Sequence, residues 1–248
     1  MSPRPYRAGQ RQTASEQTRA RIVAAARELL ISPGGYANFS IETVARQADV
    51  ARMTVYHHFG SKLGLLEALC DSLASSGGMQ ELATAFQQPE PLAALNRFIE
   101  IFGRFWDADR SVLRRLRALA VLDPDIEQLI QTRDEWRRRG LQVIAQRLLV
   151  QQAPSSEDAH RENAPGFCPD EQSASSHSAV RADSPRGSWF AGRQAPAGNQ
   201  TLDQCVEVLF TLTSFECFDM LAGPTRSIEA VVPVMQQLAR AALNLSEE

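Results

Sequence analysis

Lysine and long apolar runs are both nearly absent from this sequence. Lys62 is the only lysine among the 26 basic residues, so arginine supplies almost all of the positive charge. The most apolar stretch, residues 202–221, contains four acidic residues, which argues against a membrane-spanning segment. Residues 1–12 contain no apolar run typical of a signal peptide. We therefore expect a cytoplasmic protein with no membrane partner.

Patterns that bind metals or perform catalysis are also missing. The four cysteines follow no closely paired spacing, and they are Cys70, Cys168, Cys205 and Cys217. Such cysteines are typical of reduced thiols in a cytosolic protein, and a metal site that includes His160 or His177 is disfavoured because no ligand pair has zinc-like spacing. There is no glycine-rich phosphate loop, nucleophile elbow or helical His pair with a Glu. We expect no metal, no cofactor and no enzymatic activity.

The charge is distributed unevenly along the chain. The 248 residues suffice for one small and one larger domain. Residues 1–62 hold nine Arg or Lys and four Asp or Glu, whereas residues 201–248 hold two and seven. A basic N-terminal part on an acidic body is typical of a DNA-binding protein with a second function in its other half.

The stretch from Ser40 to Lys62 predicts two short helices joined by a tight turn. Ser40 is a good N-cap, and the apolar residues that follow it recur at helical spacing. The turn at residues 48–50 needs one residue with positive φ, and Asp49 is the residue there that tolerates it. We therefore predict a helix-turn-helix motif, with its second helix at residues 51–58.

The second helix carries an unusual outward face. Val55 and Phe59 point toward the first helix, while Met53 and His57 point away from it. Such an outward face is poorly suited to simple solvation and well suited to reading base edges. Lys62 lies in the first turn of the next helix, where a cation opposes the helix dipole. This position is explained if Lys62 and the helix N-terminus together bind a phosphate.

The residues of this region resemble the DNA-binding domain of the TetR/AcrR family of bacterial transcriptional regulators. The matching positions are Arg19, Ile22, Ala25, Ala26, Leu29, Gly35, Tyr36, Ser40, Val44, Ala45, Val50, Thr54, Val55, Tyr56, His58, Phe59, Ser61 and Lys62. Two departures are Asp49 in place of the usual turn glycine and Ala51 in place of the usual Ser or Thr cap. Neither departure removes an expected DNA contact.

The outward geometry and the resemblance together predict the DNA contacts. We expect Ser40, Tyr56 and Lys62 to bind phosphates. Met53, Thr54 and His57 are expected to meet base edges. Arg52 falls near the inner margin of the helix, and its long side chain suits either role.

The apolar periodicity predicts an all-α fold. We expect a flexible basic arm (1–17), a three-helix helix-turn-helix domain (18–78) and a helical regulatory and dimerisation domain (79–248). Residues 154–200 are rich in Pro, Gly, Ser and Ala, and this composition predicts a disordered insertion within the last domain.

The body is expected to form a dimer and to hold a ligand. The predicted helices at 201–221 and 226–245 are apolar around most of their girth, and the resemblance implies that they pair with their mates in a homodimer. The resemblance also implies an internal cavity near the aromatic residues Phe98, Phe102, Phe105, Trp106, Trp136, Phe215 and Phe218. We expect a small apolar or aromatic effector there, with Arg104, Asp107 or Glu216 orienting any polar group.

The resemblance implies a dimeric regulator, most often a repressor, that binds a palindromic double-stranded operator and releases it when the effector binds. Two alternatives remain open at this stage: an activator, and a DNA-binding dimer with no small-molecule response.

Overall fold

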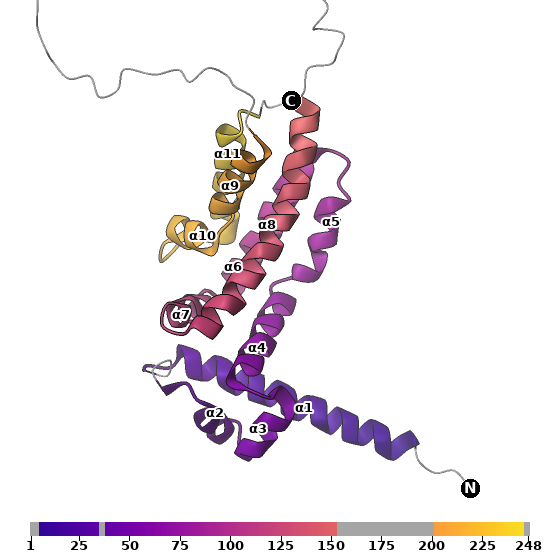
Figure 1. The fold of residues 1–248 in the computed structure, drawn as a ribbon, viewed down its shortest axis with the longest axis vertical. Coiled ribbons are helices and arrows are strands. Elements are labelled where there is room, and N and C mark those ends of the chain that lie inside the picture. Colours follow the sequence, from indigo (N-terminus) through magenta and orange to yellow (C-terminus); the bar gives the residue numbers. More distant parts are fainter. Residues whose placement is uncertain (1–4, 35–37, 153–200, 246–248) are drawn as a thin grey trace, which may run out of the picture.

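The structure is a computed structural model that describes residues 5–34, 38–152 and 201–245. The regular elements in these ranges are helices, and none of the described residues forms a strand. The expected all-α class is confirmed. Figure 1 shows a small cluster of helices at the N-terminal end beneath an elongated helical body.

The N-terminal cluster, or head, consists of α1 (Pro5–Ile31), α2 (Ile41–Gln47) and α3 (Arg52–Phe59). Its core is fully buried and includes Ile22, Leu30 and Val55. These apolar residues lie on one face of each helix, so three short amphipathic segments bury a common centre. The structure thereby has the predicted helix-turn-helix order.

Residues 5–17, which the sequence placed in a flexible arm, are helical in the structure, because α1 already begins at Pro5. Residues 1–4 of that arm lie outside the described residues. Residues 10–17 are exposed, so tertiary packing does not order them. A helix that is anchored further along extends at low cost per residue, and Pro at the first position has a favourable φ. The side chain of Gln12 also donates to Glu16 over 3.2 Å, one turn away.

The body starts with α4, which leaves the head and runs into the regulatory helices (Figure 1). The chain breaks after α4, where Gly78 has a φ of 81°. The body elements are α4 (Lys62–Ser76), the 3-10 helix η2 (Met79–Glu81), α5 (Leu82–Phe86), α6 (Pro91–Ala108), α7 (Arg110–Ala120), α8 (Pro124–Gln152), α9 (Leu202–Leu212), α10 (Phe215–Ala222) and α11 (Ile228–Ala242).

The segment predicted as one helix at 201–221 is two helices, α9 and α10. Thr213 ends the first, and Ser214 has an extended conformation with φ −70° and ψ 158°. Its hydroxyl accepts a hydrogen bond from the Cys217 amide over 3.1 Å, which caps the second helix. The apolar pattern runs through the break, so periodicity alone did not locate it. The expected disordered insertion at 154–200, with Cys168, His160 and His177, lies outside the described residues.

Candidate DNA interface and effector cavity

The turn between α2 and α3 has the predicted geometry. Asp49 has a φ of 50°, so it occupies the left-handed region where glycine is usual. The Val50 amide donates to the Ala45 carbonyl over 3.0 Å and closes the turn. Ala51 precedes α3 and makes no side-chain cap, because its methyl group cannot accept a hydrogen bond.

The outward face of α3 presents the expected residues. Val55 is fully buried beneath the helix, whereas Met53 is 73% exposed and His57 is also exposed. Thr54 and Tyr56 are half-buried on the flanks. The residues predicted to read bases are therefore accessible on the surface.

Arg52 lies on the outer surface and not near the inner margin of α3, which corrects the sequence interpretation. Its Nη1 is 2.6 Å from Glu42 Oε1 on α2, and its Nη2 donates to the Tyr56 hydroxyl over 3.1 Å. The hydrogen bond with Tyr56, followed by the charge of Glu42, raises the pKa of Arg52. These contacts hold the guanidinium in a defined position beside Tyr56.

Ser40 and Lys62 mark the starts of α2 and α4. The Ser40 hydroxyl accepts from the Thr43 amide over 3.2 Å, so it is the N-cap of α2. Lys62 Nζ lies 3.2 Å from Asp123 Oδ2 in the turn before α8, a partner that the sequence did not predict. Burial alone would raise the pKa of Asp123, but the hydrogen bond from Lys62 and its charge outweigh it and lower this pKa. Lys62 remains 39% exposed and accessible to an incoming anion.

The end of α3 packs directly against the first turn of α4. A Cβ at Gly64 would lie 2.2 Å from the Phe59 carbonyl oxygen, so only glycine fits at this position. From α1, Arg19 lies over the Phe59 ring, 4.6 Å from its centroid, and donates to the His58 carbonyl over 3.3 Å. These contacts fix the orientation of α3 within the head.

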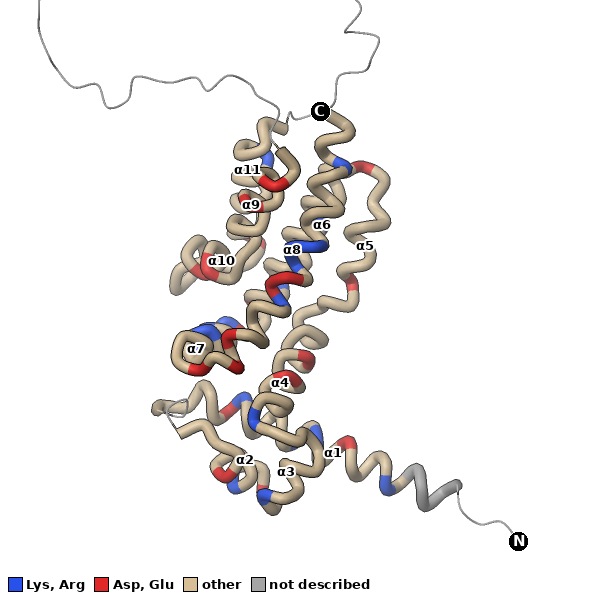
Figure 2. The backbone as a smooth tube through the Cα atoms, in the orientation of Figure 1, with Lys and Arg blue, Asp and Glu red and all other residues tan. Residues whose placement is uncertain are grey.

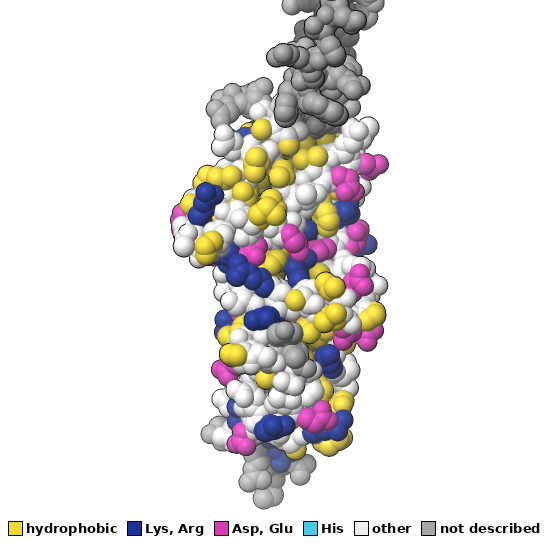
Figure 3. Space-filling view, turned by 90° about the vertical axis from the view of Figure 1, so that its left-hand side faces the viewer, with side chains coloured by type: hydrophobic (Ala, Val, Ile, Leu, Met, Phe, Trp, Pro, Cys, Tyr) yellow, Lys and Arg dark blue, Asp and Glu magenta, His cyan; other side chains and the backbone are white. Residues whose placement is uncertain are grey.

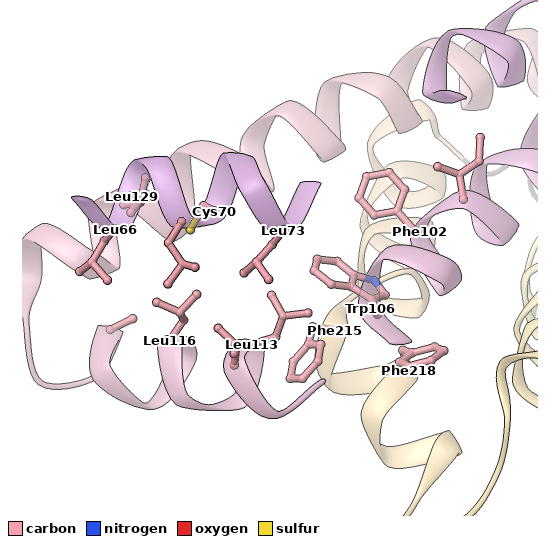
Figure 4. Packing of buried hydrophobic residues seen from close by; sticks show 14 of the residues in the cluster. Leu66, Cys70, Leu73, Phe102, Trp106, Leu113, Leu116, Leu129, Phe215 and Phe218 are labelled. Atoms are coloured by element: carbon pink, nitrogen blue, oxygen red, sulfur yellow. The ribbon is translucent and has the colours of Figure 1, made fainter. Parts of the chain in front are cut away.

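Several contacts hold the head and α4 against the rest of the body. Arg27 of α1 forms an ion pair with Asp109 before α7, and Lys62 at the start of α4 pairs with Asp123. Figure 2 shows basic positions on α1, α2 and α3 and at the start of α4. Figure 4 shows Leu66 and Leu73 of α4 facing the side chains of α7 across a shared apolar layer. The head therefore lies against the body through α4 and the end of α1.

A cavity of about 310 Å³ lies inside the body beside α4. Its walls come from α4, α6, α7 and α8, together with Met79 and Leu82. The lining residues are Cys70, Asp71, Leu73, Ala74, Met79, Leu82, Phe102, Phe105, Trp106, Leu113, Leu116, Arg117, Ile130, Arg133, Asp134, Trp136 and Arg137. The volume lies near the small end of the usual range of ligand pockets, about 300–1,000 Å³.

Four of the seven aromatic residues proposed for the cavity line it, namely Phe102, Phe105, Trp106 and Trp136. The other three do not line it, because they complete the surrounding core. Phe98 is fully buried and packs on Phe102 with ring centroids 4.6 Å apart. Phe215 packs on Trp106 with ring centroids 5.7 Å apart. Phe218 is fully buried, and the Arg110 guanidinium lies over its ring.

The polar side of the cavity differs from the sequence expectation. Arg104 pairs with Glu81 over 2.8 Å, and neither Asp107 nor Glu216 lines the cavity. Instead, α8 contributes Arg137, which is only 3% exposed. Burial lowers the pKa of Arg137 to about 10, against the opposing charge of Asp134, so the guanidinium stays charged at neutral pH.

A comparison with known protein families identifies the head. Residues 22–69, from α1 through α4, match the family described as "Bacterial regulatory proteins, tetR family". Residues 22–69 of this chain form a TetR-family DNA-binding domain. The matched segment contains the helix-turn-helix and the junction with the body, as the sequence resemblance predicted. No protein with a curated description matches the chain.

Solved structures share the fold of this chain over nearly its whole length. Salmonella enterica GusR is 16% identical, with a TM-score of 0.51, and the match covers 92% of this chain and 96% of that one. A fatty acid metabolism regulator from Clostridium perfringens is 12% identical (TM-score 0.53; coverage 92% and 99%). A transcriptional regulator from Rhodococcus sp. Rha1 is 13% identical (0.50; 92% and 99%). At these identities the similarity shows a TetR-type regulator fold.

The sequence did not predict the buried arginines of α8. Acidic residues are interleaved at residues 133–139, a pattern typical of a solvated helix face. However, Arg133 and Arg137 lie one turn apart on the same stripe as Leu129, Leu141 and Ile144, which face inward. Two arginines that interrupt an apolar stripe at a spacing of four residues were the signal that could have revealed them.

Within residues 5–34, 38–152 and 201–245, no group of His, Cys, Asp and Glu is arranged to hold a metal ion. Over the same part of the chain, no helix is long and apolar enough to cross a bilayer.

Proposed function

We propose that this protein is a dimeric transcription regulator that binds a palindromic operator through α3 and is released from DNA by a small molecule in its body. The observation that carries the proposal is the outward face of α3, where exposed Met53 and His57 lie beside a fixed Arg52. Two such faces related by a twofold axis would read two half-sites.

Each residue of the interface has a proposed role. Met53, Thr54 and His57 meet base edges in the major groove. Ser40, Tyr56 and Lys62 bind backbone phosphates, and the position of Arg52 beside Tyr56 suits either target. Footprinting upstream of the chain's own gene and its neighbours tests the proposal. Absence of any protected palindrome, with the protein binding all DNA equally, would contradict it.

Replacing Lys62 with alanine is expected to weaken binding to operator and random DNA by the same factor. The slope of log affinity against log salt should fall by about one, because one phosphate contact is lost. Asp123→Asn should act in the opposite direction, since it removes the carboxylate that now pairs with Lys62 at 3.2 Å. Fluorescence anisotropy across a salt series measures both effects. Unchanged affinity and slope in Lys62→Ala would show that Lys62 does not contact phosphate.

The dimer is proposed to form through the helices at the C-terminal end. Figure 3 shows hydrophobic side chains gathered over the part of the body farthest from the head, on the side where Figure 1 places α9 and α11. Two large apolar residues of α10 and α11 are exposed, Met220 at 82% and Leu238 at 39%. Exposed apolar surface of this kind is typical of an interaction site.

The double variant Met220→Asp/Leu238→Asp is therefore expected to shift the protein from dimer toward monomer, because charges are costly in an apolar interface. Sedimentation equilibrium measures the shift. Val121→Asp is a matched control, since Val121 is 83% exposed but lies in the turn before α8. Equal dimerisation of both variants would place the interface elsewhere.

A DNA-binding dimer without a small-molecule response is the second candidate. The cavity of about 310 Å³ with its aromatic wall favours the responsive regulator, because a mostly apolar cavity of this size is typical of a ligand site and dimerisation does not require one. Whether DNA binding represses or activates is tested with a reporter gene placed behind the footprinted operator. We propose repression, which gives higher expression in cells that lack the protein.

A further inference from the structure

The cavity has an apolar end and a cationic side. Figure 4 shows Leu73 of α4 and Leu113 and Leu116 of α7 lining one layer, with Phe102 and Trp106 of α6 at its end. Along α8, in contrast, the lining includes arginine side chains. A ligand that fills this space therefore needs an apolar body and one polar group.

Arg133 and Arg137 lie one helical turn apart on the same face of α8. Arg137 Nη1 donates to the Phe210 carbonyl over 2.6 Å and to the Thr213 hydroxyl over 2.9 Å. The Nε atoms of both arginines are buried and have no hydrogen-bond partner among the described residues. An unsatisfied buried donor is costly, so each guanidinium has hydrogen-bonding capacity that the described residues do not use.

The charges around the cavity leave this side positive. Arg117, Arg133 and Arg137 are each less than one-third exposed, and so is one acid, Asp134. The other acids in contact with them lie toward solvent: Asp71 is 70% exposed beside Arg133, and Glu216 is 59% exposed beside Arg117. Solvent screens those two carboxylates more strongly than it screens the buried arginines.

We propose that the cavity binds an apolar monocarboxylate, with its carboxylate held by Arg133 and Arg137 and its body packed against Phe102, Phe105 and Trp106. This inference rests on the proposed function, and it names the chemical class of the effector. An arginine fork matches a carboxylate, and charge-assisted hydrogen bonds are the stronger kind. The volume of about 310 Å³ restricts the ligand to a small one, either aliphatic or aromatic.

Arg133 also links the cavity to α4, the helix that leads to the DNA head. Arg133 Nη2 lies 2.7 Å from Asp71 Oδ1 and donates to the Glu67 carbonyl over 3.3 Å, and both partners belong to α4. A carboxylate on Arg133 competes with Asp71 and loosens α8 from α4. Because α4 begins at Lys62 beside α3, ligand binding changes the placement of the recognition helix.

The test measures ligand binding to the full chain without DNA. Octanoate and 4-phenylbutyrate are titrated at pH 7 against their uncharged amides, octanamide and 4-phenylbutyramide, with tryptophan fluorescence and calorimetry. We expect one or both acids to bind at least about tenfold more tightly than the matching amide, which is about 1.4 kcal/mol. The acid that binds more tightly distinguishes an aliphatic from an aromatic ligand. Equal binding of acids and amides, or binding of neither, would overturn the proposal.

Arg133→Gln should lower the ratio of acid to amide affinity severalfold, because one of the two arginines that hold the carboxylate is lost. Arg139→Gln is the matched control, because it removes the same charge from α8 at a side chain that is 70% exposed and does not line the cavity. A preserved ratio in Arg133→Gln would also overturn the proposal.

If only amides release the operator, the ligand class is wrong but the regulator function stands. Conversely, acids that bind to a protein without an operator support the ligand class and contradict the regulator function.

Discussion

Replacing Arg137 with alanine is expected to lower the free energy of unfolding by about 3 kcal/mol, since removal of one partner from a buried charged network costs ~3–5 kcal/mol. The guanidinium joins α8 to the end of α9 through the Phe210 carbonyl and the Thr213 hydroxyl. It also lies over the Phe210 ring, 4.0 Å from the centroid. Thermal unfolding should shift downward by roughly 6–12 °C for a protein of this size.

Arg139→Ala is the control for this variant, because it removes the same side chain from a position that is 70% exposed. Its pair with Glu135 is a surface pair within one helix, which is worth a few tenths of a kcal/mol. A loss of stability in Arg137→Ala no larger than in Arg139→Ala would show that the buried network contributes little. Arg137→Met adds a second comparison, because it keeps most of the packing volume and removes the hydrogen bonds.

Gly64→Ala is expected to lower operator affinity at least about tenfold and to destabilise the head by roughly 1–3 kcal/mol. The added Cβ would lie 2.2 Å from the Phe59 carbonyl oxygen, so α3 and α4 must move apart. Helix propensity alone predicts the opposite sign, since alanine is favoured over glycine by about 1 kcal/mol inside a helix. Denaturant unfolding and anisotropy with labelled operator measure the two effects.

Ser72→Ala is the matched control, because Ser72 lies two turns further along α4 and its side chain is exposed. This variant gains helix propensity without a clash and should bind the operator normally. A Gly64→Ala protein that is more stable and binds the operator normally would mean that the close approach of α3 and α4 does not position the recognition helix.

The head was predictable because its signals are local. The cap at Ser40, the turn at Asp49 and the inward position of Val55 each depend on residues within a few positions in the chain. Helix periodicity and capping operate over this range, so the motif and its outward face follow from the sequence. The extension of α1 to Pro5 was missed because the first residues combine arginine with Pro, Gly, Gln and Ser, a composition typical of a flexible terminus.

The body was predictable only as a set of helices. Local patterns place α6 and α8, but the break at Ser214 and the partition of the aromatic residues depend on packing between distant segments. Phe98 and Phe102 are one turn apart on α6, and only Phe102 lines the cavity. The ring of Phe98 instead packs beside Gly140 of α8, where an added Cβ would lie 3.1 Å from it.

The sequence by itself determined the TetR-type head, the all-α class and the identity of the residues on the outer face of α3, because each follows from spacing within single helices. Only the tertiary structure decided which charges meet. The pairs Lys62–Asp123 and Arg133–Asp71 join residues more than sixty positions apart. The burial of Arg137 likewise depends on α9, which lies beyond residues 153–200 in the chain. No local pattern encodes such contacts, since they depend on how the helices pack together.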